Sequence, residues 1–270
     1  MKRIRLLVID PQNDFMDVEG AALPVPGASA DMDRLSRFIA QMSGFIDDIV
    51  VTLDSHASVG IERTTFWLDA NGTAVAPFTV ITVADFESGR YHPRNERRAQ
   101  EALAYLQALE AGGERTLVVW PVHCVLGTWG HNIAPVLATQ LAAWELTSGQ
   151  TCEKLLKGQH PMTEQYSAFR ADVPRADDPR TRLNTALLSR LGGGDELLVV
   201  AGEALSHCVA ASGQDMLEGL DAARLRNTVF LTDCMSPVTG FETAGADFLQ
   251  QLRERHVRTL TTQEVAGLFT

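Results

Sequence analysis

The sequence predicts a doubly wound, Rossmann-like α/β fold, with helices on both faces of a mostly parallel, six-stranded sheet. One reason is that short runs rich in Val, Ile and Leu alternate with longer segments of helical periodicity. Another is that these runs are continuously apolar, whereas a strand with one solvated face would alternate apolar and polar residues. Strands covered on both faces are typical of such a sheet.

Five runs are strong strand candidates, and two weaker runs extend the set. The strong runs lie at 4–9, 48–53, 116–120, 197–201 and 228–232. A weaker run lies at 152–157, and an edge strand is expected at 257–261. Helical patterns occur at 29–43, 95–112, 131–143, 180–191, 207–220 and 240–255.

The length and composition fit a single domain spanning residues 1–270. The 270 residues are 45% hydrophobic and 21% charged, which is ordinary for a soluble globular protein. Residues 55–94 are the least regular part and contain Asn71-Gly72, Pro77 and Pro93. We predict that this stretch is an ordered excursion over the functional site, not a linker between domains.

Charge and cysteine content exclude several classes of partner and compartment. The formal charge of −11 disfavours nucleic acid and anionic membrane surfaces, because both are bound by clustered Lys and Arg. No window approaches the roughly 20 apolar residues of a membrane span. The four cysteines form no CxxC pair, so reduced thiols and a cytoplasmic location are expected.

Reactive side chains follow the predicted strands, at the ends where open parallel sheets bind ligands. Asp10 follows the first run, Lys157 ends the weak run, and Cys208 follows the run at 197–201. A thiol at the start of a helix has its pKa lowered by the helix dipole, and the N–H groups there can stabilise an oxyanion. The acid can take the thiol proton while the ammonium favours the thiolate. Singly, each residue also fits a structural role, such as an inert buried cysteine.

Six motifs in order carry a resemblance to a known family. They are DPQNDF (10–15), LDSH (53–56), WPVHCVLGTWG (120–130), LKG (156–158), YSAF (166–169) and GEALSHCV (202–209). The series resembles the nicotinamidase-like cysteine hydrolases of the isochorismatase-like superfamily. The resemblance implies a catalytic triad of Asp10, Lys157 and Cys208. It also implies an oxyanion hole at the backbone N–H groups of Ala204 and Cys208, after a cis peptide between Glu203 and Ala204.

The same resemblance implies an activity and a mode of substrate binding. The activity is cleavage of a small carboxamide, with nicotinamide as the leading substrate, through a thioester on Cys208 and with release of ammonia. Phe15 would pack against a planar substrate ring and Trp67 would form a second wall, although ordinary core packing is equally compatible with both aromatics. Family members self-associate, so a homo-oligomer is expected.

The metal site that the resemblance implies is incomplete in the sequence. A divalent metal such as zinc would bind Asp54 and His56, which share one face of an extended segment. The expected third position, three residues before Phe66, holds Arg63, which cannot coordinate a metal. Glu62 or His92 could replace the missing ligand, and we interpret His123 as a structural histidine. Arg63 could instead pair with a substrate carboxylate.

Other functions therefore stay open beside carboxamide hydrolysis. Arg63 would suit a carbamoyl or ureido substrate, and an incomplete metal site would suit a catalytically silent ligand-binding relative. His207 also departs from the tyrosine common in nicotinamidases. A vinyl-ether hydrolase of the isochorismatase kind is disfavoured, because such enzymes usually lack the cysteine that Cys208 provides.

Overall fold

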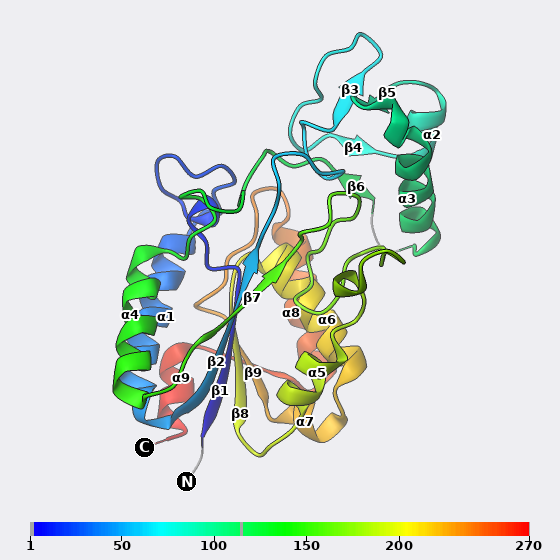
Figure 1. The fold of residues 1–270 in the computed structure, drawn as a ribbon. Coiled ribbons are helices and arrows are strands. Elements are labelled where there is room, and N and C mark those ends of the chain that lie inside the picture. The colour runs from blue at the N-terminus through cyan, green and yellow to red at the C-terminus, as the bar shows by residue number, and fades with distance from the viewer. Residues whose placement is uncertain (1–2, 114–115, 270) are drawn as a thin grey trace.

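A six-stranded sheet in which all strands run parallel forms the centre of the protein (Figure 1). The structure is a computed structural model, and it describes residues 3–113 and 116–269. The order across the sheet is β10 (Arg258–Leu260), β9 (Thr228–Leu231), β8 (Leu197–Gly202), β1 (Ile4–Ile9), β2 (Ile46–Asp54) and β7 (Glu153–Lys157). The predicted fold class is confirmed. No helix in the described ranges is long and apolar enough to cross a membrane.

Helices cover both faces of this sheet (Figure 1). One face packs against α1 (Ala28–Met42), α4 (Pro135–Ser148) and α9 (Thr262–Gly267). The other packs against α5 (Thr185–Gly192), α6 (Ala210–Gly219), α7 (Ala222–Arg226) and α8 (Glu242–Glu254). Successive β1 side chains enter opposite cores: Leu6 and Val8 enter the first, and Leu7 and Ile9 the second. Burial on both sides explains the continuous apolar run.

Local capping signals set the helix boundaries. Helix α4 begins at Pro135, later than the periodicity predicted, because proline is favoured in the first turn of a helix. It ends at Ser148, and the next residue, Gly149, caps it with a φ of 72°. Helix α5 begins after Asn184, whose side chain accepts a hydrogen bond from the Leu187 N–H at 3.0 Å. Short 3₁₀ helices cover Asn13–Phe15, Ser43–Phe45, Glu96–Arg98 and Pro179–Thr181. Helices α2 (Val83–Glu87), α7 and α9 were not predicted, since they are too short to show a period.

One predicted strand lies outside the central sheet. Within the 116–120 run, β6 (Leu117–Val118) pairs antiparallel with β4 (Val80–Ile81). Leu117 is buried with Ile81 in a separate apolar cluster. The sixth place in the sheet belongs to β7, which has several exposed residues because it is an edge strand. An apolar run predicts burial but cannot say in which core the segment is buried.

Residues 55–94 form the ordered excursion that was expected. Strand β3 (Trp67–Asp69) pairs antiparallel with β5 (Tyr91–Pro93), and α3 (Ala99–Ala111) follows. Figure 1 shows these elements beyond the end of the sheet where β1 and β2 finish. Because Arg63 pairs with Trp120 and the Ile61 N–H donates to Pro161 O, we propose that excursion and sheet form one domain, 1–270. Residues 1, 2, 114, 115 and 270 lie outside the described part.

Trp67 belongs to the core of this excursion. Its ring is fully buried against Phe66 and Phe86, and its Nε1–H donates to Ile61 O at 2.6 Å. The ring is packed against other aromatic side chains and its N–H is hydrogen-bonded within the protein, so Trp67 stabilises the core and does not contact substrate.

The substitution Trp67→Phe should lower the free energy of unfolding by about 1–3 kcal/mol, because the buried Ile61 carbonyl loses its donor. Urea denaturation followed by circular dichroism measures this. Trp129→Phe is the matched control, since Trp129 is 48% exposed and its replacement should change stability by less than about 0.5 kcal/mol. Equal losses for the two variants would contradict the packing role.

Candidate active site

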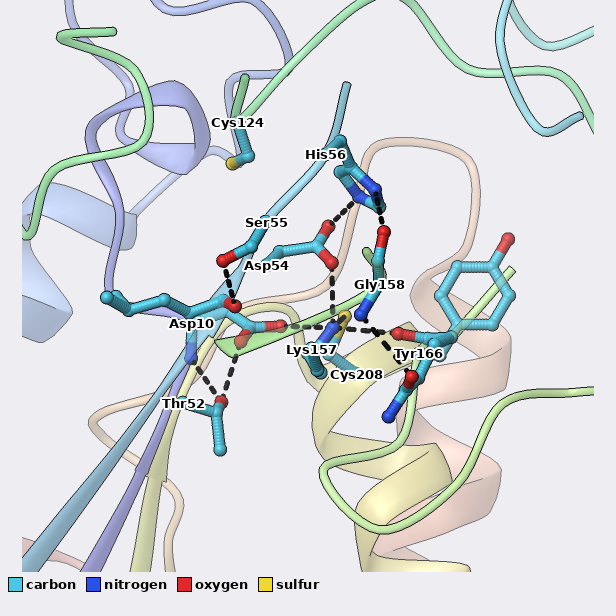
Figure 2. A network of polar contacts seen from close by, with 12 residues as sticks. Asp10, Thr52, Asp54, Ser55, His56, Cys124, Lys157, Gly158, Tyr166 and Cys208 are labelled. Carbon is cyan, nitrogen blue, oxygen red and sulfur yellow. Dashed lines mark hydrogen bonds and ion pairs between the residues drawn. The ribbon is translucent and has the colours of Figure 1, made fainter. Parts of the chain in front are cut away.

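Four neighbouring strands bring reactive side chains to one place. Asp10 follows β1, Asp54 ends β2, Lys157 ends β7, and Cys208 lies in a π-helical turn, Leu205–Val209, after β8. Strands β8, β1, β2 and β7 are adjacent, and the parallel register sets Asp54 beside Lys157. The carboxyl ends of parallel strands meet at one edge, so residues far apart in the chain converge there (Figure 2).

The ammonium of Lys157 is the centre of this cluster. Its Nζ lies 2.9 Å from Asp10 Oδ2, 3.1 Å from Asp54 Oδ1 and 3.6 Å from Cys208 Sγ. It also donates to the Gln165 carbonyl at 2.9 Å. The side chain is buried, and Figure 2 shows the carboxylates and the sulfur around one nitrogen. The structure thus brings together the three residues predicted to form the triad.

Burial and mutual charge set the protonation of the acid and the base. Burial raises the pKa of Asp10 above its usual value, although the Lys157 charge opposes the rise. Burial would lower the pKa of Lys157, but the charges of Asp10 and Asp54 outweigh it, and the pKa stands well above its usual value. Lys157 is therefore a permanent cation, whereas Asp10 is a carboxyl that can accept and return a proton.

The prediction that the helix dipole lowers the pKa of Cys208 is wrong. Burial raises the pKa of this thiol well above its ordinary value, and Asp10 and Asp54 raise it further, while Lys157 opposes them. A hydrogen bond from the thiol to Asp10 adds to the rise. Desolvation of a thiolate outweighs the effect of one turn of irregular helix. The resting nucleophile is therefore a neutral thiol.

Asp10 is held by its backbone and by one side chain. Its φ of 44° lies in the left-handed region, which aspartate tolerates better than most residues. The Thr52 hydroxyl donates to Asp10 Oδ1 at 2.6 Å. This bond occupies one carboxylate oxygen and leaves Oδ2 for Lys157 and the thiol. Thr52 is a site residue that the sequence analysis missed, since a threonine inside a strand carries no separate signal.

The segment before Cys208 has the geometry expected of the oxyanion turn. The peptide between Glu203 and Ala204 is cis, as the resemblance implied. Ala204 and Cys208 both line the cavity described next. The Ala204 N–H donates to no other residue in the ranges that the structure describes, whereas the next N–H, of Leu205, donates to Ser236 O at 2.9 Å. The backbone donor at Ala204 is therefore available to a ligand.

A small cavity of about 20 Å³ opens onto Cys208. Its walls are mainly aromatic and aliphatic, and the residues that line it are Phe15, Leu23, Asp54, Trp120, His123, Glu164, Tyr166, Ala204, His207, Cys208 and Val238. Trp120 Nε1–H donates to the Tyr166 hydroxyl at 2.7 Å, and His207 packs edge-on against Trp120 at a centroid distance of 5.0 Å. Such walls suit a flat, uncharged ligand.

Phe15 lies in the cavity wall as expected, but Trp67 and Arg63 do not. Trp67 is in the core of the excursion. Arg63 is completely buried, with its Nε 2.9 Å from Glu62 Oε1 and its Nη1–H donating to His123 O at 3.0 Å. The expectation that Arg63 pairs with a substrate carboxylate is therefore wrong, because its guanidinium is used inside the protein.

Asp54, His56 and His123 form a candidate metal site. His56 Nε2 lies 2.6 Å from Asp54 Oδ2, and His123 Nε2 lies 3.4 Å from the same oxygen. All three side chains are buried, and their ligand atoms lie within 4.8 Å of one another. His123 thus lies where the third ligand appeared to be missing, so its place in the structure fits a metal ligand as well as the structural histidine that the sequence suggested.

Backbone carbonyls orient both histidine rings. His56 Nδ1 lies 2.9 Å from the Gly158 carbonyl, and His123 Nδ1 lies 2.8 Å from the Pro121 carbonyl. Carbonyl oxygens only accept, so each Nδ1–H donates to its carbonyl, and Nε2 is the nitrogen that faces Asp54 and would bind a metal. One carboxylate and two imidazoles in this arrangement fit a divalent metal ion.

The two substitutes considered for the third ligand lie outside this set. His92 is in β5, with its Nδ1 3.5 Å from the Leu68 carbonyl across the hairpin. Glu62 is closer, with Oε1 3.6 Å from His56 Nδ1, but it pairs with Arg63. Glu62 therefore neutralises the arginine beside the site.

Further residues that position the site were also missed. Gln12 donates to the Asp54 carbonyl at 2.8 Å and accepts from the Asp54 N–H at 2.7 Å. Gly158 has φ 72°, and a Cβ there would lie 2.8 Å from Asp54 Oδ1. Both residues fall in motifs quoted above, DPQNDF and LKG, so the motif series contained the signal although single-residue reasoning did not.

Comparison with known proteins agrees with this geometry. No protein-family profile matches the chain. The nicotinamidase of *Saccharomyces cerevisiae* is 28% identical over 238 residues, which is 87% of this chain and 88% of that protein. The solved structure of the yeast nicotinamidase Pnc1p aligns over 95% of this chain and 99% of its own, with TM-score 0.64 and 23% identity.

Further solved structures share the fold. A nicotinamidase/pyrazinamidase of *Acinetobacter baumanii* has TM-score 0.65 and 21% identity over 98% of this chain and 99% of its own. An isochorismatase-like hydrolase of *Alkaliphilus metalliredigens* has TM-score 0.54 and 18% identity over 99% of this chain and 100% of its own. This chain has the isochorismatase-like hydrolase fold. The nicotinamidase-like resemblance predicted from the motifs is confirmed.

The substitution His123→Ala should greatly reduce metal binding, because it removes one of the three side chains of the candidate metal site. Replacing a residue that only hydrogen-bonds a metal ligand costs about 10–100-fold in metal affinity, and losing a ligand itself should cost at least as much. Zinc titration of metal-stripped protein measures this. His92→Ala is the matched control and should keep the wild-type affinity. If His92→Ala lost more metal affinity than His123→Ala, the third ligand would come from residues 55–94 and not from His123.

Proposed function

We propose that the chain is a cysteine amidohydrolase that cleaves a small, nicotinamide-like carboxamide through a thioester on Cys208. The observation that carries this proposal is the contact of Lys157 Nζ with both Asp10 and Cys208 Sγ beside a cavity with aromatic walls. The sequence relative is a nicotinamidase, which acts on such an amide. One acid–base group, one fixed cation and one nucleophile within contact distance can carry out stepwise amide hydrolysis.

In the first step, Asp10 accepts the thiol proton and the sulfur attacks the amide carbonyl carbon. Lys157 Nζ contacts both Asp10 Oδ2 and the sulfur, so the thiol and its base lie next to the same ammonium. Lys157 lies 3.6 Å from the sulfur and stabilises the developing thiolate. The carbonyl oxygen becomes an oxyanion, which accepts hydrogen bonds from the Ala204 and Cys208 N–H groups.

In the following steps, protonated Asp10 returns its proton to the departing nitrogen, and ammonia leaves. The acyl group then remains as a thioester on Cys208. Asp10 takes a proton from water, the resulting hydroxide attacks the thioester carbon, and the acid leaves while the thiol regains its proton. The raised pKa of Asp10, caused by burial, suits a group that must act alternately as base and acid.

Asp54, His56 and His123 would hold a divalent ion, for which zinc is the best candidate given the two imidazoles and one carboxylate. A similar fold, a *Pyrococcus horikoshii* pyrazinamidase with TM-score 0.53, was solved in complex with zinc. When bound, the ion supplies a Lewis acid beside the cavity. Asp54 and His123 line that cavity together with Cys208, so both face the same ligand.

Hydrolysis of a carbamoyl or ureido compound is the second candidate, because the same triad would perform it. Its specific support was Arg63, and that guanidinium is buried away from the cavity. A catalytically silent relative is disfavoured by the contacts among Asp10, Lys157 and Cys208. We further propose that the enzyme works in the cytoplasm, since its four cysteines are free thiols, and as a homo-oligomer, which the family resemblance implies.

The substitution Cys208→Ala should reduce ammonia release from nicotinamide by at least about 10³-fold, because the thioester cannot form. Cys152→Ala is the matched control, since Cys152 is also a buried free thiol but does not line the cavity. Quenched mass spectrometry of the wild type should find an acyl group on Cys208. Ammonia release by wild type no greater than by Cys208→Ala, across carboxamides and carbamoyl compounds, would end the amidase proposal.

The rate should also fall on acidification at a pH above the ordinary range of aspartate. Asp10 must be ionised to accept the thiol proton, and burial raises its pKa, so kcat/KM is lost as the pH falls through this raised value. A pH profile of kcat/KM for nicotinamide measures the acid limb. A limb at or below the usual aspartate value of about 3.9 would contradict Asp10 as the buried base.

A further inference from the structure

Two carboxyl groups lie buried behind the oxyanion turn, outside the triad and the metal cluster. Glu203 follows β8 directly and is 0% exposed, and Asp31 lies in the first turn of α1 and is 2% exposed. Neither lines the cavity. Burying a carboxyl group is costly unless it is hydrogen-bonded, and the triad residues do not stabilise this pair.

The hydrogen bonds around the pair place a shared proton in it. Glu203 Oε2 accepts from the Ser236 N–H at 3.1 Å, while Oε1 has no donor among the described residues. Asp31 Oδ2 accepts from the Ser236 hydroxyl at 2.5 Å, and Asp31 Oδ1 accepts from Arg34. Ser236 therefore holds the two buried carboxyl groups next to each other, one through its N–H and the other through its hydroxyl. Two ionised carboxylates this close would repel each other, so one of them keeps its proton.

The surrounding charges identify Glu203 as the protonated partner. Burial raises the pKa of Glu203 well above its usual value, and Asp31 and, more weakly, Asp17 raise it further. Around the pair, Arg34 on α1 already donates to Asp31 and to the Asp233 carbonyl. The segment after β9 contributes the Asp233 carboxylate and the Cys234 thiol, neither of which is a cation.

The pair is connected to the oxyanion turn through Ser236. Ser236 donates to both carboxyl groups, and its carbonyl accepts from the Leu205 N–H at 2.9 Å. One residue further on, the Val238 N–H donates to the Ser206 hydroxyl at 3.0 Å. Ala204 lies between Glu203 and Leu205, so its N–H is flanked on both sides by groups bound to this cluster.

We propose that Glu203 is a positioning residue, whose protonated carboxyl donates to Asp31 and thereby holds the oxyanion turn, and whose ionisation limits activity at alkaline pH. The catalytic part of this inference rests on the proposed function. Ionised Glu203 would face the Asp31 carboxylate with no free cation beside it, and repulsion would displace the turn that carries Ala204 and Cys208. The Glu203→Gln variant keeps a neutral donor of the same shape and has no proton to lose.

The first test needs no substrate. The folded state holds the Glu203 proton more tightly than the unfolded chain does, so stability falls as pH rises above the unfolded value of about 4.3 and levels off above the raised folded pKa. Within that window, each pH unit should lower the folded-to-unfolded ratio of the wild type about tenfold relative to Glu203→Gln. Urea denaturation of both proteins across this pH range measures the ratio. Parallel curves would overturn the shared proton.

The second test concerns catalysis. Glu203→Gln should keep kcat within about threefold of wild type at neutral pH, and its alkaline limb should move to higher pH or disappear. Glu203→Leu, which lacks the donor, should lose about 10–100-fold in kcat with little change in KM, as expected for a group that acts on the transition state. Identical alkaline limbs for wild type and Glu203→Gln would overturn the positioning role.

The two tests separate the inference from the proposed function. If the wild type hydrolyses no amide, the proposed function fails, but the stability curves still decide whether Glu203 and Asp31 share a proton. If amide hydrolysis is found and the stability curves are parallel, the inference fails alone. If Glu203→Leu does not fold, the comparison of wild type with Glu203→Gln decides by itself.

Discussion

The structure depends on a single buried ammonium, that of Lys157. An isolated charge at this depth would cost several kcal/mol, and it is tolerated because two carboxylates and a carbonyl surround it. Asp10 comes from β1, Asp54 from β2 and Lys157 from β7, so the ion pairs join three adjacent strands at their carboxyl ends. The edge strand β7 is thereby joined to the centre of the sheet by ion pairs as well as by its pairing with β2.

Asp54 connects the two halves of the site through its two oxygens. Oδ1 pairs with Lys157, whereas Oδ2 faces the Nε2 atoms of His56 and His123. The charges of His56 and Lys157 outweigh burial and keep the pKa of Asp54 well below its usual value, so it stays ionised. A shared carboxylate fixes the metal ligands relative to the nucleophile without any contact between them, and Gly158 leaves room for it.

The sequence predicted the triad because strand ends and ordered motifs point to the same residues. It could not place His123 beside Asp54 and His56, since that position depends on the pairing of His56 with Val125, a contact between segments about 70 residues apart. The same limit applies to Arg63 and to the 116–120 run. Residue type and spacing predict that a side chain is buried and near a site, but the path of the excursion decides which partner it meets.

The electrostatics of the cavity favour an uncharged amide over an acidic substrate. Asp54 is ionised, and Glu164 is neutral, because burial and the nearby charges of Glu62 and Asp54 raise its pKa well above the usual value. Burial and the Arg63 charge lower the pKa of His123, so that imidazole is neutral as well. No lysine or arginine is among the lining residues in the described chain. A substrate carboxylate would lose its hydration here without a lysine or arginine in the cavity wall to pair with, whereas a neutral carboxamide on a flat ring gains the contacts of the aromatic walls.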